Sequence, residues 1–224
     1  MIILPAIIPE NIEDIETHLL QVKGMVRNVQ IDICDGRLSP SPSWPYINER
    51  GELQEMLLQQ RGLPFWENFD FEFDLMVTNP EKEYERWIDI GASRIIFHYK
   101  ESDVEKLKDL IQKTKDRGVE AGLALHLSDP VEVLEEFKGL IDSVQFMGIE
   151  RIGYQGEPFD SRVIEKIKKS KELYPDLIIG VDGGVNADTA PLLAYAGAKR
   201  LVIGSAIFNT HDIAETVGYF KSLM

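Results

Sequence analysis

Short apolar runs rich in β-branched and aromatic residues recur along the chain, and segments with helical periodicity separate them. In one such segment, Val104, Leu107, Leu110 and Ile111 form an apolar face within a charged stretch. Eight such units predict an α/β fold, a (β/α)8 TIM barrel formed as a single domain over residues 1–224. A doubly wound sheet is the rival architecture, but no G-x-G-x-x-G sequence follows the first apolar run. The eight runs are Ile2–Ile7, Val29–Ile33, Phe71–Met76, Arg94–His98, Val119–Leu125, Ser143–Met147, Leu177–Asp182 and Arg200–Ile203.

The overall charge narrows the class of partner. The 224 residues include 24 Lys and Arg against 38 Asp and Glu, which gives a net charge of −14. An acidic chain without a basic cluster is not expected to bind nucleic acid or an anionic membrane surface. No apolar run reaches the roughly 20 residues that span a bilayer, and the single cysteine, Cys34, can form no internal disulfide. We therefore expect a cytoplasmic protein.

Inward-pointing carboxylates are the first chemical feature that such a barrel would create. The outward side chains of barrel strands are apolar because they meet the helices, so the alternate residues point inward. This parity places Asp32, Asp74 and Asp182 inside, near the carboxyl ends of their strands. Since an unpaired buried carboxylate is costly, the three need a metal ion, a cation, shared protons or water. Met76 and His98 also point inward, and His98 either contacts a ligand or is a hydrogen-bonded interior histidine.

Glycine-bearing turns follow the last three predicted strands. Backbone N–H groups can approach an anion closely where glycine removes the side chain, and barrels often bind phosphate after strands seven and eight. The sequence therefore predicts a phosphate-binding site at this end of the barrel. The candidate residues are Gly153, Gly156, Gly183, Gly184, Gly204 and Ser205.

Motifs spread over the whole chain resemble those of the ribulose-phosphate 3-epimerases, a family of ribulose-phosphate-binding barrels. The matching segments follow the family's order and have similar spacing. They are Pro5-Ala6-Ile7-Ile8, Ile31-Asp32-Ile33-Cys34-Asp35-Gly36, Asp74-Leu75-Met76-Val77-Thr78-Asn79-Pro80, Phe97-His98, Gly153-Tyr154-Gln155-Gly156, Val181-Asp182-Gly183-Gly184 and Gly204-Ser205-Ala206-Ile207-Phe208.

The resemblance implies an isomerase of pentose phosphate metabolism. It would epimerise a ketopentose 5-phosphate, or a related ketose phosphate, at C3 through an enediolate. In the family two aspartates act as acid and base on opposite faces of the sugar, and they match Asp32 and Asp182. The glycine turns, with Met76 and His98, would hold the small phosphorylated sugar.

Two departures from the family concern its metal site. The family's divalent ion is held by the two aspartates and by two histidines, whose positions are Gln30 and Asp74 here. The candidate ligands Asp32, Asp74 and Asp182 are all oxygen donors, which favours Mg²⁺ or Mn²⁺ over Zn²⁺ or Fe²⁺. Without a metal, a shared proton or a cation such as Arg37 would have to offset the carboxylates. The sequence leaves both alternatives open.

Other departures keep two further functions open. Ala6 occupies the place of a serine that contacts substrate in the family. A non-catalytic sugar-phosphate-binding barrel and a Mg²⁺-dependent lyase or aldolase acting on a ketose phosphate are therefore alternatives to the epimerase. We also expect a homo-oligomer. The exposed apolar residues Trp44, Phe65 and Trp66 are candidates for the subunit contact, and the alternatives are that they cover the bottom of the barrel or form a lid.

Overall fold

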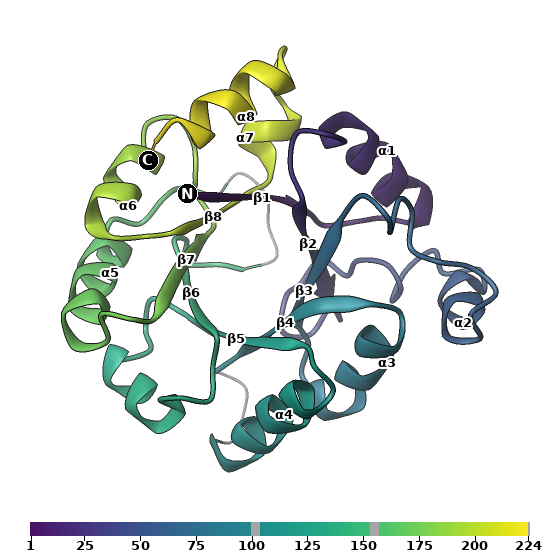
Figure 1. The fold of residues 1–224 in the computed structure, drawn as a ribbon, viewed down its shortest axis with the longest axis horizontal. Helices are drawn as coiled ribbons and strands as arrows, with labels where there is room; N and C mark the ends of the chain where they lie inside the picture. The colour runs from purple at the N-terminus through teal and green to yellow at the C-terminus, as the bar shows by residue number, and fades with distance from the viewer. Residues whose placement is uncertain (100–103, 153–156, 224) are drawn as a thin grey trace.

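Eight parallel strands close into a barrel in the computed structural model, which describes residues 1–99, 104–152 and 157–223. Each strand pairs with its neighbours in sequence, and β8 pairs with β1 to complete the ring. Figure 1 looks along the barrel and shows this ring with the helices outside it. The predicted (β/α)8 TIM barrel is therefore confirmed. The strands are β1 (Ile2–Ile7), β2 (Asn28–Cys34), β3 (Asp70–Met76), β4 (Ala92–His98), β5 (Glu120–Leu125), β6 (Ser143–Met147), β7 (Ile178–Asp182) and β8 (Arg200–Ile203).

Helices and 3-10 turns connect the strands, and local side chains fix where two of them begin. Asn11 accepts a hydrogen bond from the backbone N–H of Asp14 before α1, and Asp212 caps α8 through Glu215 in the same way. The helices are α1 (Ile12–Val22), α2 (Glu52–Leu57), α3 (Tyr84–Asp89), α4 (Val104–Asp116), α5 (Arg162–Leu173), α6 (Ala190–Ala196), α7 (Ser205–Phe208) and α8 (Ile213–Lys221), and the 3-10 helices are η1 (Pro80–Lys82) and η2 (Val131–Phe137).

The main hydrophobic core lies between the strands and the helices. The outward residues of β2, Val29, Ile31 and Ile33, are fully buried there, as their alternation predicts. Burial of each such side chain contributes about 1.5–3 kcal/mol. Trp44 also belongs to this core, where it packs edge to face against Trp87 with the ring centroids 6.1 Å apart. The expectation that Trp44 is exposed is therefore wrong, because the loop after β2 folds back over the barrel wall.

The interior of the barrel is layered. Near the amino-terminal ends of the strands, Glu72 forms ion pairs with Arg94 and Arg200, and all three side chains are buried. Burial raises the pKa of Glu72 to about 7 although the charge of Arg94 opposes the shift. Ionic side chains thus fill the floor of the barrel, and the candidate site lies in the layer above them.

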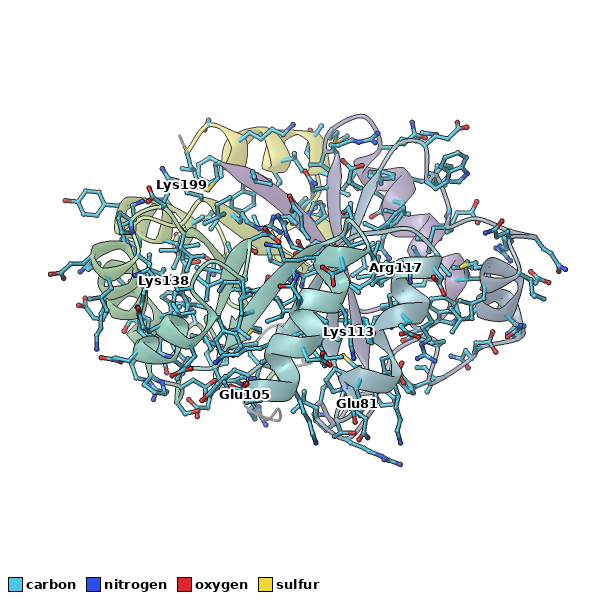
Figure 2. The ribbon with its side chains drawn as sticks, turned by 60° about the horizontal axis from the view of Figure 1, so that its bottom comes forward. Glu81, Glu105, Lys113, Arg117, Lys138 and Lys199 are labelled. Carbon is cyan, nitrogen blue, oxygen red and sulfur yellow. The ribbon has the colours of Figure 1, made fainter. Side chains whose placement is uncertain are left out.

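The outer surface carries most of the acidic surplus. Figure 2 shows charged side chains such as Glu105 and Lys113 on the outside of α4, and Lys113 pairs with Asp109 at 2.7 Å. Across the described residues, none of the helices combines the length and the apolar character that crossing a membrane requires.

Candidate active site

Three carboxylates meet inside the barrel, as the strand parity predicts. Asp32, Asp74 and Asp182 are 4%, 0% and 9% exposed, and each offers an oxygen within 4.8 Å of the others. Asp32 and Asp74 lie side by side because they are register partners on β2 and β3. Asp182 reaches them from the carboxyl end of β7. The fold therefore creates a compact acidic cluster from residues that are 150 positions apart at most.

Two buried glutamine side chains link the carboxylates to one another. The Gln30 amide nitrogen donates to Asp32 Oδ1 at 2.8 Å and to Asp182 Oδ2 at 3.0 Å. The Gln145 amide nitrogen donates to Asp74 Oδ2 at 2.9 Å and to Asp182 Oδ2 at 3.4 Å. Gln145 was not among the predicted site residues; strand parity places it inward, between Ser143 and Met147 on β6, but does not indicate its partners.

A histidine supplies the cationic partner of the cluster. His98 Nε2 lies 2.6 Å from Asp74 Oδ1, and His98 Nδ1 lies 3.1 Å from Nε2 of His126. Burial lowers the pKa of His98, but the charge and the hydrogen bond of Asp74 outweigh it and raise the pKa overall. The exposed Arg37 instead borders a separate cavity with Tyr46. The expectation that Arg37 offsets the carboxylates is therefore wrong.

Burial and neighbouring charges shift the protonation of Asp32 and Asp182, which both line the main cavity. Burial, followed by the charge of Asp74, raises the pKa of Asp182 to about 7. Burial also raises the pKa of Asp32 well above its ordinary value, and the charges of Asp182 and Asp74 add to the effect. Both shifts favour the protonated form of these carboxyl groups, and because the two groups interact, their titrations are linked.

A cavity of about 200 Å³ opens above the acidic cluster. Asp32 and Asp182 line it together with Met76, whereas Asp74 and His98 are not among its lining residues. His98 lies behind Asp74 with hydrogen-bond partners at both ring nitrogens. This is the hydrogen-bonded interior position that the sequence left open, and its contact with substrate stays a prediction.

The turns after β7 and β8 border the same cavity. Gly183, Gly184, Gly204 and Ser205 all line it, so the structure brings these four predicted phosphate-binding residues beside Asp182. Gly183 and Gly184 have φ values of +91° and +68°, a backbone conformation that favours glycine. The other two candidates, Gly153 and Gly156, lie outside the described residues.

The donor set of the cluster fits a hard divalent cation. Asp32, Asp74 and Asp182 offer oxygen atoms only, which suits Mg²⁺ or Mn²⁺. Gln30 Oε1 is buried and has no hydrogen-bond partner among the described residues, so a fourth oxygen next to the cluster is unsatisfied. Within the described part of the chain, His98 is the side chain that pairs ionically with the three carboxylates, so the cluster is short of positive charge.

Sequence comparison agrees with the motifs. The profile described as the ribulose-phosphate 3 epimerase family matches residues 2–208. The chain belongs to the ribulose-phosphate 3-epimerase family. It is 32% identical over 221 residues to the ribulose-phosphate 3-epimerase of Bacillus subtilis, a match that covers 96% of this chain and 93% of that protein. The enzyme of that name from Aquifex aeolicus is 27% identical over 91% of this chain and 87% of its own length.

Membership of the ribulose-phosphate 3-epimerase family confirms the predicted resemblance. The match is shorter in some relatives. The ribulose-phosphate 3-epimerase of Eremothecium gossypii is 32% identical over 151 residues, which are 67% of this chain and 62% of that protein. Among solved structures, the 3-hexulose-6-phosphate synthase from Salmonella typhimurium has a TM-score of 0.73 at 17% identity, and the match covers 100% of this chain and 98% of that one. This likeness shows the shared fold.

Proposed function

We propose that this protein is an isomerase that epimerises a ketopentose 5-phosphate, or a related ketose phosphate, at C3. One observation carries the proposal: Asp32 on β2 and Asp182 on β7 line one cavity, which also borders the glycine turns after β7 and β8. Family membership favours this reaction over a non-catalytic binding protein or a lyase. The small phosphorylated sugar is the partner for which this cavity is suited.

The two aspartates would act as acid and base in turn. One ionised carboxylate removes the C3 proton, and the C–H electron pair moves toward the neighbouring carbonyl to form the enediolate. The other carboxyl group, protonated at the start, then donates its proton to C3 on the opposite face, and the carbonyl re-forms. Raised pKa values suit these roles because one carboxyl must be protonated and the other ionised near neutral pH.

The phosphate group would bind at the turns that contain Gly183, Gly184, Gly204 and Ser205. Backbone N–H groups in such turns can surround an anion without a lysine or arginine. We also assign Gly153 and Gly156, from the loop after β6, to this group. Met76 would contact the body of the sugar from β3, since it lines the cavity beside Asp32.

Asp32, Asp74 and Asp182 would hold a divalent ion, and we propose Mg²⁺ or Mn²⁺ rather than Zn²⁺ or Fe²⁺ because the donors are all oxygens. A bound ion would add positive charge that stabilises the enediolate. In the same proposal Asp32 and Asp182 move the protons, whereas Asp74 and His98 lie behind them and do not line the cavity.

Three expectations about the whole protein remain part of this proposal. We infer a cytoplasmic protein with no affinity for nucleic acid or membranes, in keeping with its net charge of −14. We also infer one domain over residues 1–224 and a homo-oligomer. Trp66, at 63% exposure, remains a candidate contact residue for the oligomer, whereas Trp44 does not.

Incorporation of solvent deuterium at C3 of ribulose 5-phosphate tests the function directly. The wild-type protein, assayed with Mg²⁺ or Mn²⁺, should exchange this proton and form the C3 epimer. Asp32→Asn and Asp182→Asn should each lower the rate by about 10²–10⁴-fold, the usual contribution of one acid or base. If the wild-type protein incorporates no deuterium with either ion, the epimerase proposal is wrong.

A further inference from the structure

The amides of Gln30 and Gln145 are placed where they can control the geometry of proton transfer. Both side chains are buried in the barrel, at 0% and 2% exposure. They come from β2 and β6, on different sides of β7 in the ring. A buried amide nitrogen has two N–H donors, and each of these amides uses them on two different carboxylates.

Asp182 is the carboxylate on which the two amides meet. Its Oδ2 accepts from Gln30 at 3.0 Å and from Gln145 at 3.4 Å. Charge-assisted hydrogen bonds of this kind fix the orientation of a carboxylate, and the oxygen that accepts them is occupied by the amide donors. Asp182 therefore has one oxygen, Oδ2, tied to the amides while its side chain still lines the cavity.

The two amides differ in the carboxylates that they contact. Gln30 connects Asp182 to Asp32, so it bridges the two groups that transfer protons in the proposed reaction. Gln145 connects Asp182 to Asp74, which is absent from the cavity wall. Loss of Gln145 thus alters the support of one acid/base group, whereas loss of Gln30 alters both.

We propose that Gln30 and Gln145 are positioning residues for epimerisation, and that Gln145 acts on one face of the sugar through Asp182. This inference rests on the proposed function, because it assigns Asp182 to proton transfer at C3. A displacement of about 1 Å in a catalytic group can lower a rate about 100-fold, so amide contacts of this kind matter for the chemical step. Among the described residues, both amides donate to the carboxylates and not to the turns that contain Gly183, Gly184, Gly204 and Ser205.

The test compares Gln145→Leu and Gln30→Leu with Ser143→Ala. Leucine keeps similar volume but donates no hydrogen bond. Ser143 is a matched control because it is a buried, inward residue on the same strand as Gln145, and among the described residues its hydroxyl makes no hydrogen bond to the three carboxylates. Each variant is assayed in deuterated water from both C3 epimers, with deuterium measured in the recovered substrate and in the product. Binding of inorganic phosphate and the thermal unfolding midpoint are measured alongside.

We expect Gln145→Leu to lower kcat about 10- to 100-fold with little change in KM or in phosphate binding. The decisive readout is the ratio of deuterium exchange in recovered substrate to product formation. For the epimer that Asp32 deprotonates, this ratio should rise, because product formation requires reprotonation by Asp182, which is slowed. For the other epimer the ratio should fall, because there Asp182 returns the proton to the substrate. Gln30→Leu should lower both rates with a smaller change in the ratio, and Ser143→Ala should match wild type.

Several results would overturn the inference while leaving the epimerase proposal intact. One is a Gln145→Leu enzyme with wild-type kcat. Another is a lower kcat with both exchange ratios unchanged, which would indicate a general loss of folded enzyme. Should Gln145→Leu not fold, Gln145→Glu carries the same test, because it keeps the side-chain length and replaces the donor with an acceptor. If wild-type protein itself exchanges no proton, the proposed function fails instead.

Discussion

Asp32 lies directly beside Asp74 in the register between β2 and β3, so two inward carboxylates occupy neighbouring positions inside the barrel. Like charges at such positions repel and destabilise the sheet. Hydrogen bonds from Gln30, Gln145 and His98 offset part of that cost. Burial, with the neighbouring carboxylate charges adding to it, raises the pKa values of Asp32 and Asp182, so titration can report on the site.

The stability of the fold should fall as the pH rises from about 4 to about 7. An unfolded aspartate ionises near its ordinary pKa of 3.8, whereas folded Asp182 retains its proton until about pH 7. The unfolded state therefore binds fewer protons in this window, and the free energy of unfolding declines with pH. Asp182→Asn should remove the contribution of Asp182 to this decline, so the stability of the variant relative to wild type should increase by about 2–4 kcal/mol between pH 4.5 and pH 8.

Urea unfolding of both proteins at several pH values, with a chelator present, measures this difference. The exposed Asp188→Asn is the matched control and should follow the wild-type curve. Parallel curves for Asp182→Asn and wild type would show that Asp182 ionises normally in the folded protein.

The rate of epimerisation should have a bell-shaped pH dependence centred near neutrality. One carboxyl must be ionised and the other protonated; the pKa of Asp182 is raised to about 7, and that of Asp32 is raised in the same direction. Measurement of kcat/KM from pH 5 to pH 9 checks this expectation. A rate that stays constant across this range would argue against two aspartates as the acid and base.

Substitution of Gly184 should impair phosphate binding. A methyl group at this position would lie 2.8 Å from the Cα of Phe159, and the φ of +68° disfavours any side chain. Gly184→Ala should raise KM for the sugar phosphate about tenfold or more and cost about 1–3 kcal/mol of stability. Steady-state kinetics and thermal unfolding provide the measurements.

Gly218→Ala is the matched control for the glycine prediction. Gly218 lies in α8, and a methyl group there would have nothing within 4 Å. It should leave KM unchanged and stabilise the protein by up to about 1 kcal/mol, since alanine favours a helix. An unchanged KM in Gly184→Ala would remove this turn from the phosphate site.

Metal affinity should depend on Asp74. Asp74→Asn removes one negative charge from the cluster of three carboxylates, and it should weaken Mn²⁺ binding at least about tenfold. Isothermal titration with Mn²⁺ measures this loss. Asp70→Asn is the control, because Asp70 lies on the same strand but pairs with Arg27 at the surface. Equal affinity in the two variants would place the metal away from the cluster.

The sequence was sufficient for the barrel and for the convergence of its carboxylates, because strand parity is a local property that the alternation of apolar residues records. Asp32, Asp74 and Asp182 point inward for this reason. The role of Gln145 was not predictable, since a single inward glutamine has no distinctive spacing and its partners come from β3 and β7. Trp44 was misplaced because the path of a long loop depends on tertiary packing.

Glu72, with Arg94 and Arg200, closes the barrel below the acidic cluster within the described part of the chain. A sugar phosphate bound above this floor would enter and leave at the carboxyl ends of the strands. The two epimers differ only at C3 and would use the same phosphate anchor, so neither has to turn round before it departs. A pocket with a single opening would release both epimers by the same route. The net direction of the reaction would therefore follow the concentrations of the two sugars.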